Sequence, residues 1–281
     1  VYGRMTGWGQ TGPLAQSAGH DLNYIAITGV LDWIGREGHA PTPPLNLVGD
    51  FGGGGLYLAL GMLAAMLQAR QSGVGQVVDA AIVDGAASLA TTIFGMHAAG
   101  LLQERGTNIL DGGAPYYDVY RCLDGNYISI APIEPKFFEE LCHRLEVAPD
   151  ALGEQNDRRA WPQTRDVLRQ IFQRKTRDQW CQLLEGTDVC FAPVLNASEA
   201  PEHAQLKARG TFVDIQGVQQ PAPAPRFSRT VPDLPSPPEP PTAENQAAAL
   251  EDWLGPLNAK PWLEALNASQ HSRHEGSHPG A

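Results

Sequence analysis

Three side chains that could exchange protons have unusual neighbours in the sequence. His20 lies in SAGHDLNYIAITG, between a glycine and Asp21, and an imidazole takes or gives a proton near neutral pH at little cost. Asp50 lies in PPLNLVGDFGGGG, shortly before four consecutive glycines. Glu134 precedes Pro135, which restrains it to an extended conformation. Each also has an ordinary structural explanation: a packed or surface histidine, and carboxylates that cap helices.

The four consecutive glycines after Asp50, residues 52–55, are unusual and need a separate explanation. Glycine loses more backbone freedom on folding than any other residue, so ordering four in a row is costly. We therefore expect a loop that a ligand approaches closely. The run lacks the GxGxxG spacing of a dinucleotide fingerprint and the Gly-Lys-Ser/Thr of a P-loop, so neither nucleotide motif applies.

Other candidate groups are weaker. His97 lies in an apolar segment and is expected in the core, and the histidines near the C-terminus (His271, His274 and His278) lie in a polar stretch. The four cysteines are scattered without CxxC spacing, so we expect free thiols and neither a disulfide nor a metal site. GxSxG and HExxH do not occur.

The elements that must position these residues follow an α/β pattern. Residues 56–70 predict a mostly buried helix, residues 76–83 a strand, and residues 84–97 a second helix. Residues 116–132 alternate around Asp124-Gly125, a dipeptide typical of a tight hairpin. Helices are expected from Pro135 and near 158–173 and 176–185, which makes this part a small α+β domain.

Composition narrows the class of protein. The chain has 281 residues, 42% hydrophobic and 18% charged, as in globular proteins. The net charge of −11 argues against nucleic acid as a partner. Without an apolar run of about 18 residues we expect no transmembrane helix and no membrane partner. The proline-rich segment 221–241 predicts an extended connector.

The chemistry-bearing segments together resemble a known group of enzymes. GRMTGWGQTGPLAQSAGHDLNYIAITG, PPLNLVGDFGGGG, GQVVDAAIVDG, DGGAPYYDVY and IEPKFF occur in the order seen in alpha-methylacyl-CoA racemases, part of the family III CoA-transferase superfamily. The resemblance runs from Val1 through APAPRFSRT. It implies a Rossmann-like α/β large domain, a small α+β domain and an interlocked homodimer. It also implies that this chain starts after the N-terminal part of the large domain.

The resemblance implies four segments. Residues 1–112 would belong to the large domain and residues 113–220 would form the small α+β domain. Residues 221–268 would be a proline-rich linker and a helix that returns to the large domain. Residues 269–281 would be a disordered tail.

The resemblance also assigns roles to residues. His20 and Asp50 would be the two acid/base groups of a racemase, and Glu134 would orient the histidine across the subunit boundary. Asp21 and Tyr24 would line the acyl pocket. The substrate would be an acyl-CoA thioester, with CoA as part of the substrate, no separate cofactor and no metal. We expect a cytoplasmic location.

The glycines receive a role on the same basis. Gly52, Gly53 and Gly54 would lie against the acyl thioester. We further hypothesise that the N–H groups of residues 52–55 donate hydrogen bonds to the enolate-like oxygen that forms when the α-proton leaves.

Two alternatives remain open at this point. In a CoA-transferase, Asp50 would be a nucleophile that forms an acyl anhydride; His20 favours the racemase, since the transferase pattern does not require a histidine there. The chain could also be an inert fragment that only dimerises or binds acyl-CoA.

Overall fold

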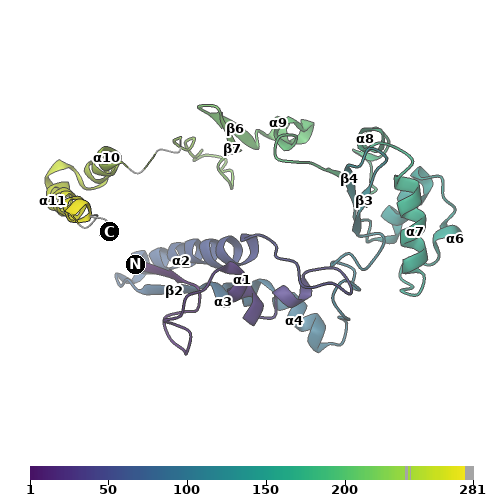
Figure 1. Cartoon of the computed structure of the whole chain (residues 1–281), viewed down its shortest axis with the longest axis horizontal. Helices are drawn as coiled ribbons and strands as arrows, with labels where there is room; N and C mark the ends of the chain where they lie inside the picture. Colours follow the sequence, from purple (N-terminus) through teal and green to yellow (C-terminus); the bar gives the residue numbers. More distant parts are fainter. Residues whose placement is uncertain (238–239, 241, 276–281) are drawn as a thin grey trace, which may run out of the picture. The chain divides into compact units, whose positions relative to one another are not determined.

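The computed structural model describes residues 1–237, 240 and 242–275. The chain divides into two compact units, the first spanning Val1–Val194 and the second starting at Leu195 (Figure 1). This division falls inside the predicted small domain 113–220 and does not separate residues 112 and 113. The boundaries implied by the resemblance therefore stay predictions.

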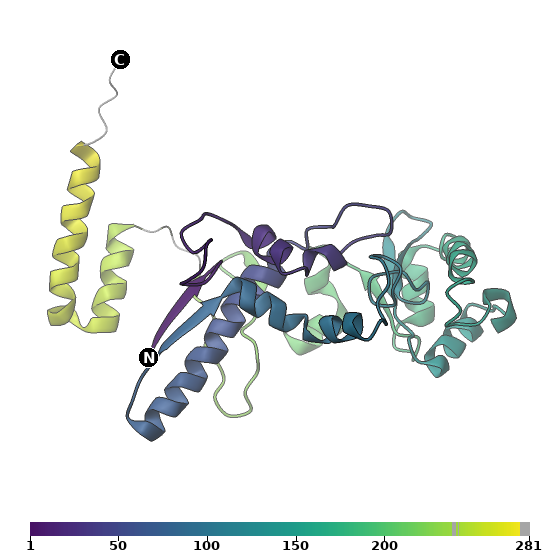
Figure 2. The ribbon, with the colours of Figure 1, turned by 90° about the horizontal axis from the view of Figure 1, so that it is seen from below.

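The first unit begins with a short parallel sheet backed by a long helix. Strands β1 (Tyr2–Thr6) and β2 (Val77–Ala81) pair in register from Tyr2–Val77 to Thr6–Ala81. Helix α2 (Tyr57–Ser72) runs beside both strands (Figures 1 and 2). Glycine allows this close approach, because a Cβ on Gly61 would lie 2.8 Å from the Val78 side chain. The predicted strand 76–83 and helix 56–70 are confirmed, but the prediction that this helix is mostly buried is wrong for the single chain, because Ala65 is the one buried residue of α2.

The glycine run forms a helix and is not a loop. Residues Leu47–Leu56 make the π-helix η2, which continues directly into α2. None of Gly52–Gly55 has a positive φ, so conformational freedom is not why glycine stands there. The prediction of a glycine loop is wrong because tertiary packing, described below, overrides the low helix propensity of glycine.

Together η2 and α2 form a 26-residue helical segment, Leu47–Ser72, with a mean hydropathy of 1.3. Its length and composition would allow it to cross a membrane, and no other helix among the described residues meets that criterion. The sequence predicted none. A core helix meets the same criterion, but only 17% of the apolar window is buried in this single chain.

The predicted helix 84–97 is two helices. Helix α3 (Ile82–Leu89) follows β2 directly, and α4 (Thr91–Ala98) starts after Ala90, whose backbone departs from helical geometry. Helix α1 (Asp21–Ile27) and the 3₁₀ turn η1 (Leu31–Trp33) complete this region. Its core of buried apolar residues is small: Ile25, Val30, Ala86 and Ala90.

The rest of the first unit is built on an antiparallel sheet. Strands β3 (Asp118–Arg121), β4 (Tyr127–Ile130) and β5 (Phe191–Val194) lie in that order. Gly125 has φ +83° in the turn between β3 and β4, so the predicted hairpin is confirmed. The helices are α5 (Pro135–Arg144), α6 (Pro149–Leu152), α7 (Trp161–Phe172) and α8 (Arg177–Leu184). We call residues 114–194 the β3–β5 region.

The β3–β5 region has a large aromatic core. Phe172 is completely buried, and its ring centroid lies 5.0 Å from that of Tyr120 and 5.1 Å from that of Trp180. Burial raises the pKa of the Tyr120 hydroxyl and raises the pKa of the Cys122 thiol to about 11. The cysteines are free, as predicted.

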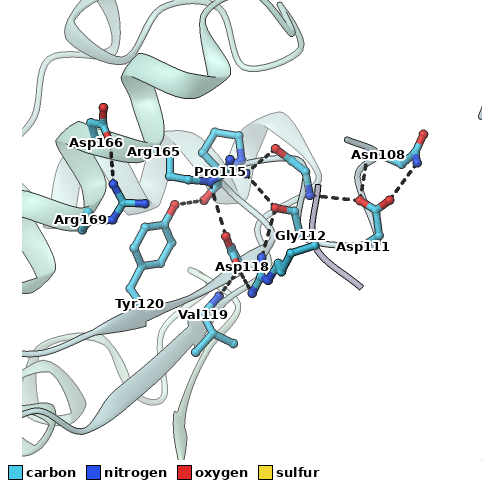
Figure 3. A network of polar contacts seen from close by, with 12 residues as sticks. Asn108, Asp111, Gly112, Pro115, Asp118, Val119, Tyr120, Arg165, Asp166 and Arg169 are labelled. Atoms are coloured by element: carbon cyan, nitrogen blue, oxygen red, sulfur yellow. Dashed lines mark hydrogen bonds and ion pairs between the residues drawn. The ribbon is translucent and has the colours of Figure 1, made fainter. Parts of the chain in front are cut away.

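A polar network joins the loop before β3 to helix α7 (Figure 3). The Asp118 carboxylate, 7% exposed, pairs with Arg36 at 2.7 Å and with Arg165 at 3.5 Å. Arg165 also donates to the carbonyl of Gly112 at 2.7 Å. The pKa of Arg36 is raised, mainly by its hydrogen bond to Asp118. The network therefore ties Arg36, in the segment after η1, to the β3–β5 region.

The second unit contains the helices η3 (Ala200–Glu202) and α9 (Ala204–Arg209), a hairpin of β6 (Phe212–Ile215) and β7 (Val218–Pro221), and the helices α10 (Ala243–Leu254) and α11 (Pro256–Glu275). Residues 222–237 contain no helix or strand, as predicted for the connector. The predicted disordered tail is wrong for residues 269–275, which continue α11; residues 276–281 lie outside the described residues.

Candidate active site

His20 stands at the start of helix α1. It is the N-cap, with an extended backbone (φ −134°, ψ 173°), and its own N–H donates to the side-chain oxygen of Asn23 at 3.1 Å. This hydrogen bond between the His20 backbone and the Asn23 side chain fixes the backbone at the helix start. His20 itself is exposed, so its imidazole is accessible to a substrate.

Tyr24 anchors the segment that leads into His20. Its hydroxyl donates to the carbonyl oxygen of Gly19, and its ring makes an edge contact with Trp8 at 4.7 Å between centroids. A Cβ on Gly7 would overlap the Tyr24 ring at 2.0 Å, so this position accepts only glycine. Burial, and secondarily the negative charge of Asp50, raise the pKa of the Tyr24 hydroxyl. The tyrosine is therefore a neutral donor close to Asp50.

Asp50 lies in the first turn of the π-helix η2 and is half-buried. One carboxylate oxygen accepts a hydrogen bond from the amide of Asn46 at 3.4 Å. The Asn46–Asp50 spacing of four residues is that of neighbours on one helix face. Sequence reasoning missed Asn46, because a stretch interpreted as a loop gives no reason to look for helical spacing.

The carboxylate of Asp21 joins the two candidate bases. Asp21 is the first residue of α1, immediately after His20, and its Oδ2 accepts the backbone N–H of Asp50 at 2.8 Å. The starts of α1 and η2 are thereby held together. Asp21 and Tyr24 are both buried, with the polar contacts described above. Their predicted role as walls of the acyl pocket stays a prediction.

The glycines of η2 allow contact with α3. A Cβ on Gly85 would lie 1.8 Å from the carbonyl oxygen of Gly53, and a Cβ on Gly53 would lie 2.6 Å from the backbone nitrogen of Ala86. Gly54 lies against Ile82 and Met5. The two helix backbones are therefore in direct contact, which accounts for Gly53 and Gly54 without a ligand.

The N–H groups of residues 52–55 are inside a helix. In a π-helix each N–H bonds to the carbonyl five residues earlier, so these donors are already used. The hypothesis that they stabilise an enolate oxygen is not supported by this geometry. The predicted substrate contacts of Gly52, Gly53 and Gly54 stay predictions.

Glu134 lies in the β3–β5 region. It is the N-cap of α5, extended (φ −73°, ψ 139°) before Pro135, and exposed. The predicted local conformation is confirmed. Among the contacts of the described residues in this single chain, none joins Glu134 to His20 or Asp50. Its pairing with His20 stays a prediction.

The described residues offer no group of three or more His, Cys, Asp or Glu side chains suited to a metal ion. A cavity of about 680 Å³ lies by η1 and strands β3 and β4, and its lining contains none of the three candidate residues. The arrangement at α1 and η2 offers an imidazole and a carboxylate at adjoining helix starts. Such a pair can serve as base and acid on two sides of a small group.

Comparison with known families identifies the wider group. Residues 1–246 match the model of CoA-transferase family III. The chain belongs to this family. It is 43% identical over 238 residues to alpha-methylacyl-CoA racemase of Mus musculus, and 42% identical over 238 residues to that of Homo sapiens. Each match covers 84% of this chain and 62% of the relative, so the chain spans less than two thirds of the length of these racemases.

Solved structures show the same fold. A CAIB/BAIF family protein from Brucella suis superposes with a TM-score of 0.73 at 24% identity, over 90% of this chain and 67% of the other. The family III CoA-transferase fold predicted from the motifs is confirmed, as a mixed α/β architecture.

Proposed function

We propose that this chain carries the acid/base groups of a racemase that interconverts (2R)- and (2S)-2-methylacyl-CoA thioesters. The observation that carries the proposal is the hydrogen bond from the Asp50 N–H to Asp21, which holds His20 and Asp50 at adjoining helix starts. The identity of 42–43% to two alpha-methylacyl-CoA racemases supports this reaction over others in the family.

The proposed mechanism uses two bases. His20, neutral, removes the α-proton of one enantiomer, and the electron pair moves toward the thioester oxygen to form an enolate. Protonated Asp50 then delivers a proton to the opposite face of the α-carbon. For the other enantiomer the roles reverse: Asp50 takes the proton and the His20 imidazolium returns one. No redox cofactor or metal enters this balance.

The proposed assembly is a homodimer. Four exposed leucines, Leu56, Leu60, Leu63 and Leu67, follow one face along η2 and α2, with 70%, 65%, 63% and 61% of each residue exposed. The opposite side of α2 packs on the sheet through Gly61 and Ala65. A helix that is apolar on both sides is normally buried. In a homodimer the partner's Glu134 could also reach His20.

Light scattering would test the assembly. We expect a dimer from the wild-type chain and a monomer from Leu63→Asp, while Leu234→Asp, a change at an exposed leucine of the connector, leaves the dimer intact. A monomeric wild-type chain that binds lipid vesicles would contradict the proposal.

A CoA-transferase is the second candidate, because the matched family is named for that reaction. There the Asp50 carboxylate would attack the thioester carbonyl, form an acyl anhydride and release CoA thiolate. The partial exposure of Asp50 is compatible with this step.

One assay separates these candidates. A single enantiomer of a 2-methylacyl-CoA is incubated in D₂O with the chain and a free carboxylic acid. Deuterium at the α-carbon with formation of both enantiomers, abolished by His20→Ala, supports the racemase. Transfer of CoA to the acid without α-exchange makes Asp50 a nucleophile and the protein a transferase.

A parallel sample carries a family-like N-terminal segment ahead of the chain. Activity in that sample alone would mean that the racemase needs residues outside this sequence. If neither sample reacts, thermal unfolding with and without CoA decides whether the chain still binds the thioester carrier, because a ligand of the folded state raises the midpoint. The cytoplasmic location and the absence of a separate cofactor remain expectations.

A further inference from the structure

Asp21 is a buried carboxylate with a single described partner. The residue is 6% exposed, its Oδ2 accepts the Asp50 N–H at 2.8 Å, and its Oδ1 is buried with no hydrogen-bond partner among the described residues. Burying a charged group is unfavourable unless it is fully hydrogen-bonded. A half-satisfied carboxylate is therefore a poor choice for stability alone.

The surroundings of Asp21 hold its position closely. A Cβ on Gly49 would lie 2.4 Å from the Asp21 Oδ2 and 3.2 Å from the Ile25 side chain. Gly49 is buried, so the carboxylate lies directly against the backbone of η2. His20 is thus connected to Asp50 by the peptide bond between His20 and Asp21 and by the hydrogen bond from the Asp50 N–H to Asp21.

We propose that Asp21 is a positioning residue that sets the place of Asp50 relative to His20. The inference rests on the racemase proposed above, since it concerns the delivery of protons to two faces of one carbon. Catalysis of this kind depends on placement: an error of about 1 Å can cost on the order of 10²-fold in rate. Asp21 would act through Asp50 without touching the substrate.

The role makes an asymmetric prediction. If Asp50 is misplaced, the enantiomer whose α-proton goes to His20 still loses that proton. His20 then returns a deuteron to the same face, so the configuration of the α-carbon is retained. Inversion of that enantiomer falls, so its ratio of α-exchange to inversion rises. The other enantiomer, whose proton goes to Asp50, slows in both measures.

The experiment compares Asp21→Ala, Asp21→Asn and Asp84→Ala with the wild-type chain. Asp84 is an exposed acid in the first turn of α3 and serves as the matched control. α-Exchange and inversion are measured in D₂O from each enantiomer separately. For Asp21→Ala we expect the ratio to rise at least about tenfold from one enantiomer only. Asp21→Asn, whose amide oxygen can accept the same N–H, should restore most of the wild-type ratio.

Amide hydrogen exchange of the Asp50 N–H is measured on the same four proteins and does not depend on activity. Protection that is lost in Asp21→Ala and kept in Asp21→Asn supports the positioning role. If the wild-type chain shows no α-exchange, that result contradicts the proposed racemase but not the contact between Asp21 and Asp50. Unchanged protection in Asp21→Ala overturns the inference. So does an equal fall of exchange and inversion from both enantiomers in proportion to the loss of folded protein.

Discussion

The two parts of the first unit are stabilised in different ways. The β3–β5 region encloses large rings such as Phe172 and Trp180, whereas the cluster of buried residues at α1 and α3 is small and contains no aromatic ring: Ile25, Val30, Ala86 and Ala90. The second region holds its helices by backbone contact, as between Gly53 and Gly85, and leaves leucines exposed on α2. The candidate acid/base pair lies in the lightly packed region, so chemistry and stability should be separable by mutation.

The largest expected effect is on chemistry. His20→Ala should lower the racemisation rate by roughly 10²–10⁴-fold, the usual contribution of a general acid/base. Because His20 is exposed, the midpoint of thermal unfolding should stay unchanged. The rate is measured from inversion of each enantiomer, and the matched control is His39→Ala, another exposed histidine. A large loss of stability in His20→Ala would break the separation of the two regions.

The next effect falls on the β3–β5 region. Phe172→Ala should reduce the free energy of unfolding by about 3–5 kcal/mol, since it removes a fully buried ring that contacts Tyr120 and Trp180. Urea denaturation measures the loss. The same change at Phe227, which is 56% exposed, should cost less than about 0.5 kcal/mol. Equal losses at both positions would refute the aromatic core as the main source of stability.

A smaller effect tests the glycine contact. Gly85→Ala should destabilise the chain by about 1–3 kcal/mol, because the new methyl group would meet the Gly53 carbonyl. Gly95→Ala is the matched control in helix α4, where nothing lies within 4 Å of the added carbon. There alanine should stabilise by about 0.5–1 kcal/mol through helix propensity. If Gly85→Ala also stabilises, the helices are not held by backbone contact.

The smallest effect concerns alkaline pH. The Cys122 pKa is raised to about 11 by burial, above the value of about 8.5 for a free thiol. The folded state therefore keeps this proton longer than the unfolded state, so the contribution to stability is full below pH ~8.5 and is lost as pH rises through about 11. Urea denaturation across this range should show Cys122→Ala losing less stability than wild type, by on the order of 1 kcal/mol. If the free energy of unfolding falls equally with pH in wild type and Cys122→Ala, the raised pKa of the Cys122 thiol is contradicted.

Sequence reasoning succeeded where local rules decide the outcome. Asp124-Gly125 determines the hairpin through the positive φ of its glycine, and Pro135 marks the start of α5 through its fixed φ. It failed at Gly52–Gly55, because the low helix propensity of glycine says nothing about a partner helix. Gly85, some thirty residues later, supplies the contact that makes a helix favourable.

The candidate site was predicted in part for similar reasons. The resemblance placed attention on His20, Asp21 and Asp50 by their order along the chain. That Asp21 accepts the Asp50 N–H is a contact between residues far apart in sequence, and no local pattern encodes it. The relation of Glu134 to the pair depends on a second chain in the proposed assembly, so it stays a prediction.

The π-helical form of η2 has a consequence for the direction in which Asp50 points. Each residue of an α-helix turns the chain by about 100°. Asp50 is separated from the regular α-helix α2 by the π-helical residues up to Leu56. Deleting one glycine between them would turn the carboxylate around the helix axis by about a quarter of a circle, although His20, Asp21 and Asp50 would all still be present. The number of glycines after Asp50 thus determines the direction in which its carboxylate points from the helix axis.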